Sequence, residues 1–269
     1  MKLGKTMAIL LALITVVQST NAQLKLSQDT ISCVVVGANF GVMMPDGKHS
    51  SDNGMHDLYK SPFLNYGVET FYKFKSNTLL SIDGFLSIGS DNLRFREQRM
   101  SNVYTHDPES IVIGSGGIAA GVECFNRGLY LRCGAGKIFK ISRKNINSGI
   151  LLRINCGIVQ QKTIFVANND KALQLDGDYA KLYDHKRRGL NLAEGIGFWY
   201  MSNNYNFVNF HVEFEVAQNF THSVRKYMID DYMGLRGKDN AKYFDLTYNV
   251  RISWMIPLRG NRDYDFYFD

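Results

Sequence analysis

The chain has 269 residues, enough for one large domain or two small ones, and carries 31 Lys and Arg against 25 Asp and Glu. No stretch after residue 22 approaches 18 consecutive apolar residues, which argues against a helical membrane span. The basic residues are scattered apart from a short cluster at 185–188, so the sequence favours no nucleic-acid partner.

The N-terminus has the organisation of a secretory signal peptide. Two lysines precede an apolar run over 7–17, and small residues at Thr20 and Ala22 come before a cleavage point. We therefore expect residues 1–22 to be removed and residues 23–269 to form one exported domain.

Alternation of apolar and polar residues dominates the mature chain and predicts β-strands. In chain order, the expected strands cover 33–43, 63–74, 78–89, 111–125, 129–136, 150–158, 190–200, 208–216 and 244–256. The last two are the clearest, with aromatic and aliphatic residues on one face and polar or charged residues on the other. Nine is an awkward number, because single-chain bacterial barrels have an even count, so eight and ten strands both stay open.

These segments predict an all-β fold, a transmembrane antiparallel up-and-down β-barrel of about 8–10 strands in the cell outer membrane. Spanning strands need about 9–11 tilted residues, and in lipid the sheet must close on itself so that every backbone polar group is paired. A soluble barrel would enclose its apolar residues. Here the apolar face carries large aromatics, and the other face carries Gly, Asn and charges that suit a narrow polar lumen.

The connections between the segments are uneven. Tight turns are expected at 75–77, 126–127 and 203–204, and long connections at 44–62, 90–110, 164–188 and 220–242. Short turns normally face the periplasm and long loops the exterior, a scheme that a turn at 126–127 fits poorly.

The expected turn at 126–127 also decides whether two of the four cysteines could form a disulfide. A turn at 126–127 would offset Cys124 from Cys133 by roughly 13 Å along the strands, too far for a disulfide. We interpret these two and Cys156 as small apolar residues of the barrel wall, and leave Cys33 open.

Several stretches resemble a family of small exported barrel proteins of Bacteroidota bacteria. They are YKFKSN (72–77), RGLYLRCGAGKIF (127–139), NSGILLRINCGIVQQK (147–162), QLDGDYAKLYD (174–184), GFWYMSNN (197–204) and the WMIPLRG ending with its aromatic tail. The resemblance implies an outer-membrane barrel without an established activity. In architecture it extends to barrel proteins of the type IX secretion and gliding apparatus.

His211, Glu213 and Glu215 share one strand face that points into the predicted lumen. They suggest either a metal or acid/base site or a network in which buried charges pair with one another, and we favour the network. The inward charges are nearly balanced, which predicts a filled interior rather than an ion-selective channel. The expected acids are Glu69, Asp83, Glu123, Glu213, Glu215 and Asp245, and the expected bases are Lys73, Arg132, Lys137, Arg153 and Arg251.

The sequence does not favour an enzyme. Ser202 and Asn203 match the Ser-Asn pair of lipid A deacylases, but Tyr200 stands where that family carries its base histidine. Asp184 and His185 are the protease candidates, although neighbouring strand residues point to opposite faces. We expect no catalytic residues, no metal and no cofactor.

Two further features of the expected loops could be functional or merely solvated surface: a basic cluster and a group of aspartates. The cluster 185–188 lies at a loop end and could meet lipopolysaccharide phosphates, although a solvated loop end is the favoured reading. Asp176, Asp178 and Asp184 lack the ligand spacing of a Ca²⁺ loop.

The sequence thus favours a non-enzymatic outer-membrane barrel that anchors or assists a cell-envelope assembly, with type IX secretion as a candidate. Its contacts would be outer-membrane lipid, lipopolysaccharide and an envelope protein, the last through loops 44–62, 164–188 and 220–242. The alternatives are a small-solute transport barrel and a lipid A-modifying hydrolase.

Overall fold

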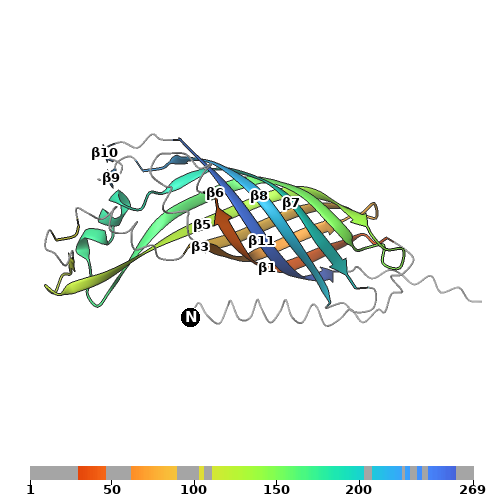
Figure 1. The fold of residues 1–269 in the computed structure, drawn as a ribbon, viewed down its shortest axis with the longest axis horizontal. Coiled ribbons are helices and arrows are strands. Elements are labelled where there is room, and N and C mark those ends of the chain that lie inside the picture. Colours follow the sequence, from red (N-terminus) through yellow and green to blue (C-terminus); the bar gives the residue numbers. More distant parts are fainter. Residues whose placement is uncertain are drawn as a thin grey trace, which may run out of the picture.

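The computed structural model describes residues 30–46, 62–89, 103–105, 111–202, 208–225, 228–230, 235–237 and 242–258. The expected signal peptide and the turn at 203–204 lie outside them. Eight long strands close into a ring, and each pairs antiparallel with both neighbours in the order β1, β2, β3, β5, β6, β7, β8, β11 (Figure 1). They are β1 Cys33–Pro45, β2 Phe63–Lys73, β3 Thr78–Gly89, β5 Ala119–Lys140, β6 Gly149–Asn168, β7 Arg187–Met201, β8 Asn209–Ser223 and β11 Lys242–Leu258.

The ring resolves the open strand count at eight. The expected turn at 126–127 is wrong, because β5 runs without interruption for 22 residues through both predicted segments. Asn126 lies in the ladder opposite Thr163, whose Oγ1 donates to the Asn126 side chain at 3.0 Å. Asn126, a residue type common in turns, is therefore kept extended by its pairing with β6. This long-range pairing cannot be seen in the local sequence. The tight turn before β3 is confirmed, with Asn77 at a φ of 60°.

The wall alternates as the sequence predicts, with large apolar side chains facing outward on every strand. Val68, Ile82 and Ile154 are each more than 60% exposed, although they lie in the middle of long strands. Aromatic pairs mark both ends of this apolar exterior: Tyr200 with Phe210 at one end and Phe220 with Phe244 at the other. Such girdles are typical of membrane-spanning barrels.

No helix among the described residues has the length and apolar character to cross a membrane.

An apolar cluster closes the end of the lumen that carries the short turns. Phe71 packs edge-on against Trp199, with ring centroids 5.1 Å apart, and Val35, Leu151 and Met255 surround them, all fully buried. These buried side chains pack together across that end of the lumen.

The opposite end carries the long connections and an extension of the sheet. β3 ends level with Arg127, but β5 and β6 stay paired as far as Gly121 and Asn168, and they project beyond the ring in Figure 1. A small second core packs on this extension, from β4 (Val112–Ile113), the 3₁₀ turns η2 (Leu173–Leu175) and η3 (Tyr179–Leu182), and neighbouring residues. Two short strands, β9 (Met228–Asp230) and β10 (Leu235–Gly237), pair with each other.

Asp170 ties the extension to the turn that precedes β5. Its carboxylate accepts from the Gly116 and Lys171 backbone N–H groups, both at 2.7 Å, and from the Ser115 hydroxyl. The Gly116 N–H is the main reason why the pKa of Asp170 lies below its ordinary value. These hydrogen bonds join the extension to the turn before β5.

Candidate functional site

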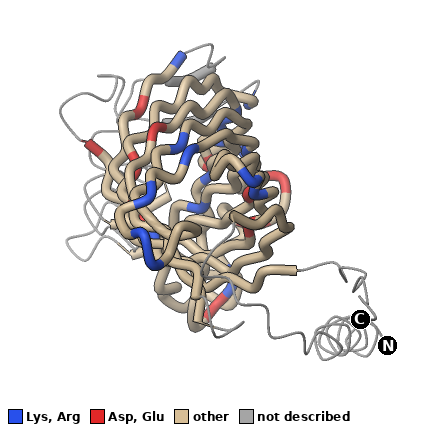
Figure 2. Tube along the Cα trace, turned by 90° about the vertical axis from the view of Figure 1, so that its right-hand side faces the viewer, with Lys and Arg blue, Asp and Glu red and all other residues tan. Residues whose placement is uncertain are grey.

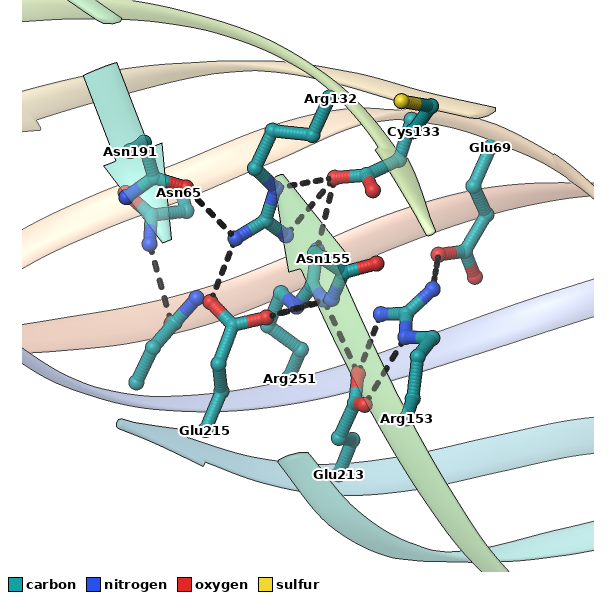
Figure 3. A network of polar contacts seen from close by, with 12 residues as sticks. Asn65, Glu69, Arg132, Cys133, Arg153, Asn155, Asn191, Glu213, Glu215 and Arg251 are labelled. Atoms are coloured by element: carbon teal, nitrogen blue, oxygen red, sulfur yellow. Dashed lines mark hydrogen bonds and ion pairs between the residues drawn. The ribbon is translucent and has the colours of Figure 1, made fainter. Parts of the chain in front are cut away.

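The lumen holds a continuous ionic network at its centre (Figure 3). Arg132 donates to Asp83 at 2.8 and 2.9 Å and to Glu215 at 2.7 Å. Arg251 reaches three carboxylates: Glu213 and Glu215 at 2.9 Å each, and Asp83 at 3.3 Å. All five side chains are at most 2% exposed. Buried charges persist only when they are paired, and here they pair across the barrel.

Register explains why these residues meet. Asp83 and Arg132 are direct partners in β3 and β5, and Glu213 and Arg251 are direct partners in β8 and β11. The long guanidinium side chains then reach across the ring to acids on distant strands. The network therefore links walls of the barrel that no backbone ladder joins.

A second group extends the network toward the short-turn end. Arg153 binds Glu213 through Nε at 3.0 Å and also through a second guanidinium nitrogen, and lies 3.7 Å from Glu69. His211 lies between these two acids, 3.3 Å from Glu69 through Nδ1, and stacks on Trp199. Lys73 lies beyond, where its Nζ donates to the Ile31 carbonyl and to the Asn147 side chain.

The carboxylates that a metal ion or an acid/base pair would need are already paired with arginines. Glu213 and Glu215 project from β8 as the sequence suggests, but Arg153, Arg132 and Arg251 occupy their oxygens. Among the described residues, no group of three His, Cys, Asp or Glu side chains could hold a metal ion. The arrangement stabilises and fills the barrel.

The predicted inward set needs two corrections and one addition. Glu123 and Lys137 lie on the odd-numbered face of β5, which faces outward along the wall. Glu123 belongs to the extension, and Lys137 donates to the Ser76 carbonyl at 2.6 Å near a short turn. The prediction for Glu123 is wrong because the expected turn at 126–127 would have exchanged the inward and outward faces of the residues before it. Arg187 was missed, and it lies buried 3.5 Å from Asp245 and over the ring of Tyr243.

The corrected lumen is balanced in charge among the described residues. Its acids are Glu69, Asp83, Glu213, Glu215 and Asp245, and its bases are Lys73, Arg132, Arg153, Arg187 and Arg251. Figure 2 shows the same mixing on a larger scale, with basic and acidic positions interspersed around the barrel.

Tyr200 and Ser202, which were compared with the lipid A deacylase motif, lie in different environments. Tyr200 faces the outer wall, whereas Ser202 is buried and its backbone N–H donates to Asn209. Asn203 lies outside the described residues.

The acidic residues of the loop before β7 are also dispersed. Asp184 binds Arg225, with one contact at 2.7 Å, and His185 lines a hollow of about the size of one water molecule. The carboxylates of Asp176 and Asp178 turn to Gly177 and Lys181. The loop therefore presents no shared ligand site from these residues.

The cysteines divide between the two faces of the wall. Cys133 and Cys156 are exposed and directly opposite each other in β5 and β6, as expected for wall residues. Cys124 is buried in an inner apolar cluster, so its placement on the wall is wrong, again because β5 is continuous. Cys33 is buried in the cluster at the short-turn end. None of these four cysteines forms a disulfide.

One charged residue interrupts the apolar exterior. Glu194 lies exposed at the centre of β7, with Leu190 and Leu192 before it and Ile196 and Phe198 after it on the same face. Its register partners are Ile154 and Val216. Among the described residues it has no hydrogen-bond or ion-pair partner. This is the feature of the outer wall that lipid alone does not explain.

A closed antiparallel ring with an apolar exterior and an ionic interior defines a transmembrane β-barrel of the outer-membrane class. No protein-family model and no curated protein matches the chain. Among solved structures, the chain is similar to Ail, the attachment invasion locus protein of Yersinia pestis, in complex with the heparin analogue sucrose octasulfate. The two are 9% identical with a TM-score of 0.36, over 84% of this chain and 97% of that one.

Two further solved structures are similar to the chain. Neisserial surface protein A is 8% identical with a TM-score of 0.31, over 81% of this chain and 96% of that one. The outer membrane protein OprG from Pseudomonas aeruginosa is 12% identical with a TM-score of 0.32, over 86% of this chain and 99% of that one.

Proposed function

We propose that this protein is a non-conducting, non-enzymatic outer-membrane barrel that serves as an anchor or accessory subunit of a cell-envelope assembly. The observation that carries the proposal is Glu194, a carboxylate without a partner among the described residues at the centre of the apolar exterior. Ionisable residues exposed to lipid are costly and mark functional contacts. A protein neighbour that donates a hydrogen bond or a positive charge there would remove this cost.

The surroundings of Glu194 suit such a contact. Gln218 of β8 faces outward opposite Leu192, one position along the same face from Glu194. Together these two polar groups give a partner in the plane of the membrane two points to bind. The extension of β5 and β6, and those parts of the predicted loops 44–62, 164–188 and 220–242 that lie beyond the strands, would add contacts outside the membrane.

The resemblance to Bacteroidota barrel proteins makes the type IX secretion apparatus our candidate assembly. The barrel would then contribute a fixed membrane position, and its partner would carry the moving or catalytic parts. Arg132, Arg153 and Arg251 engage carboxylates of the described lumen, which supports a filled, non-catalytic interior.

Glu194→Leu tests two expected properties of this carboxylate, its cost to the stability of the barrel and its contact with a partner. We expect the isolated barrel to become more stable by about 1 kcal/mol, because a carboxylate leaves the lipid-facing wall. We expect recovery of the envelope partner from detergent-solubilised native membranes to fall at least ten-fold. Unfolding of the purified variant in lipid and quantitative mass spectrometry of affinity-purified complexes would measure the two effects.

Thr70→Leu provides the matched control, since Thr70 is an exposed polar residue of the outer wall on β2, across the ring from β7. It should leave partner recovery unchanged. A photo-crosslinking residue at Leu192 should capture the same partner, and one at Thr70 should not. Equal recovery with Glu194→Leu and wild type would contradict the proposal.

The alternative of a solute channel is tested by conductance. Eight strands enclose a space that side chains fill, and here paired charges and an apolar cluster occupy it. We expect the refolded mature protein to give no steady current in planar bilayers at voltages where a porin conducts. Stable open-channel current from pure protein would favour transport instead.

A further inference from the structure

A row of basic side chains lies on the outer wall at the end that carries the long connections. Arg127 and Lys162 are register partners in β5 and β6, and Arg188 of β7, His222 of β8 and Lys242 of β11 are successive register partners. All five are exposed. This basic row crosses five neighbouring strands, a width of roughly 19 Å at the usual strand spacing.

The basic row marks the edge of the apolar exterior. The next outward residue toward the short turns is Leu129 after Arg127, Leu190 after Arg188 and Phe220 beside His222, and these are 50%, 57% and 44% exposed. The cations therefore lie where the wall passes from hydrocarbon to the headgroup layer. Because the long connections are at this end, that layer is the outer leaflet.

The basic row also differs from the cations of the lumen in its pairing. Every guanidinium of the central network reaches a carboxylate, whereas no member of the basic row has an ion-pair partner among the described residues. Like charges side by side on one sheet face repel each other. The exposed Arg and Lys side chains of this row are consistent with an anion supplied from outside the chain.

We propose that the basic row binds the phosphate groups of lipopolysaccharide in the outer leaflet. Arg127 and Arg188 can bind phosphate oxygens through two N–H groups each, and Lys162 and Lys242 add point charges. The acyl chains would lie against the apolar residues directly below. Of the sequence cluster at 185–188, Arg188 takes part, whereas His185 is buried and Arg187 points into the lumen. This site is independent of the contact proposed at Glu194.

The test uses the full mature barrel in nanodiscs of zwitterionic phospholipid, to which purified lipopolysaccharide is added. The row variant carries Arg127→Gln, Lys162→Gln, Arg188→Gln and Lys242→Gln. The matched control removes four exposed cations at the short-turn end, Lys75→Gln, Lys140→Gln, Arg143→Gln and Lys144→Gln. Bound lipopolysaccharide is counted by native mass spectrometry, and folding is checked by heat-modifiable migration on gels.

The row variant should bind lipopolysaccharide several hundred-fold more weakly, because each Lys or Arg at an anionic membrane surface contributes roughly a five-fold factor. The control should keep wild-type binding. Equal losses in both variants would mean that net charge, not the basic row, binds the lipid, and unchanged binding in the row variant would also overturn the proposal.

Wild-type protein offers a second test that needs no variant. Enzymatically dephosphorylated lipopolysaccharide should bind as weakly as the row variant binds the intact lipid. Undiminished binding of this probe would exclude phosphate recognition. Equally tight binding of the polysaccharide freed from lipid A would show that the occupant is surface sugar.

Discussion

Replacing Arg251 with alanine is expected to lower the free energy of unfolding by about 3–5 kcal/mol, because removal of one partner leaves buried charges uncompensated. Arg251 contacts Asp83, Glu213 and Glu215 from the centre of the lumen, and each of these acids is at most 1% exposed. The remaining Arg132 and Arg153 cannot neutralise all three. Urea unfolding of the refolded protein in lipid vesicles, followed by tryptophan fluorescence, would measure the loss.

A double-mutant cycle makes this prediction specific to the network. Glu215→Gln removes one of the acids that Arg251 binds, so the combined variant should lose less stability than the sum of the two single changes. Lys181→Ala, which breaks an exposed loop pair, should leave the midpoint unchanged. An Arg251→Ala barrel as stable as wild type would mean that water replaces the guanidinium, and that the lumen is less tightly filled than the packing indicates.

The second large effect concerns the packing of β2 against β3. A methyl group at Gly67 would lie 2.2 Å from the Gly84 carbonyl and 2.5 Å from Phe85 Cβ, so Gly67→Ala forces the two backbones apart. We expect a cost of about 3 kcal/mol, at the upper end of overpacking effects, and a low refolding yield. Gel migration of unheated and heated samples reports the folded fraction directly.

Gly84→Ala makes the same substitution on the partner strand. There the added methyl would meet only Leu131 and the Tyr130 carbonyl at 3.7 and 3.8 Å, ordinary contact distances, on the outward face. This variant should refold like wild type. Similar losses in both variants would point to a general intolerance of alanine in these strands instead of close approach at Gly67.

Local alternation was sufficient to predict the class of fold. Strand pattern depends on neighbouring residues alone, so the apolar exterior, the polar lumen and nine of the eleven predicted inward charges could be read from residues two positions apart. The structure places Glu69, Asp83, Arg132, Arg153 and Arg251 on the inner face as that pattern requires.

Long-range pairing decided what alternation could not. Whether β5 turns at Asn126 or continues depends on the β6 residues that pair with it, and this one choice moved Glu123 and Cys124 to opposite faces from those predicted. Arg187 and Arg188 look equivalent in the sequence, yet one binds in the lumen and the other joins the basic row. Strand register in a closed ring is set by all eight strands together, because hydrogen bonds and side-chain volumes must be satisfied around the whole circumference at once.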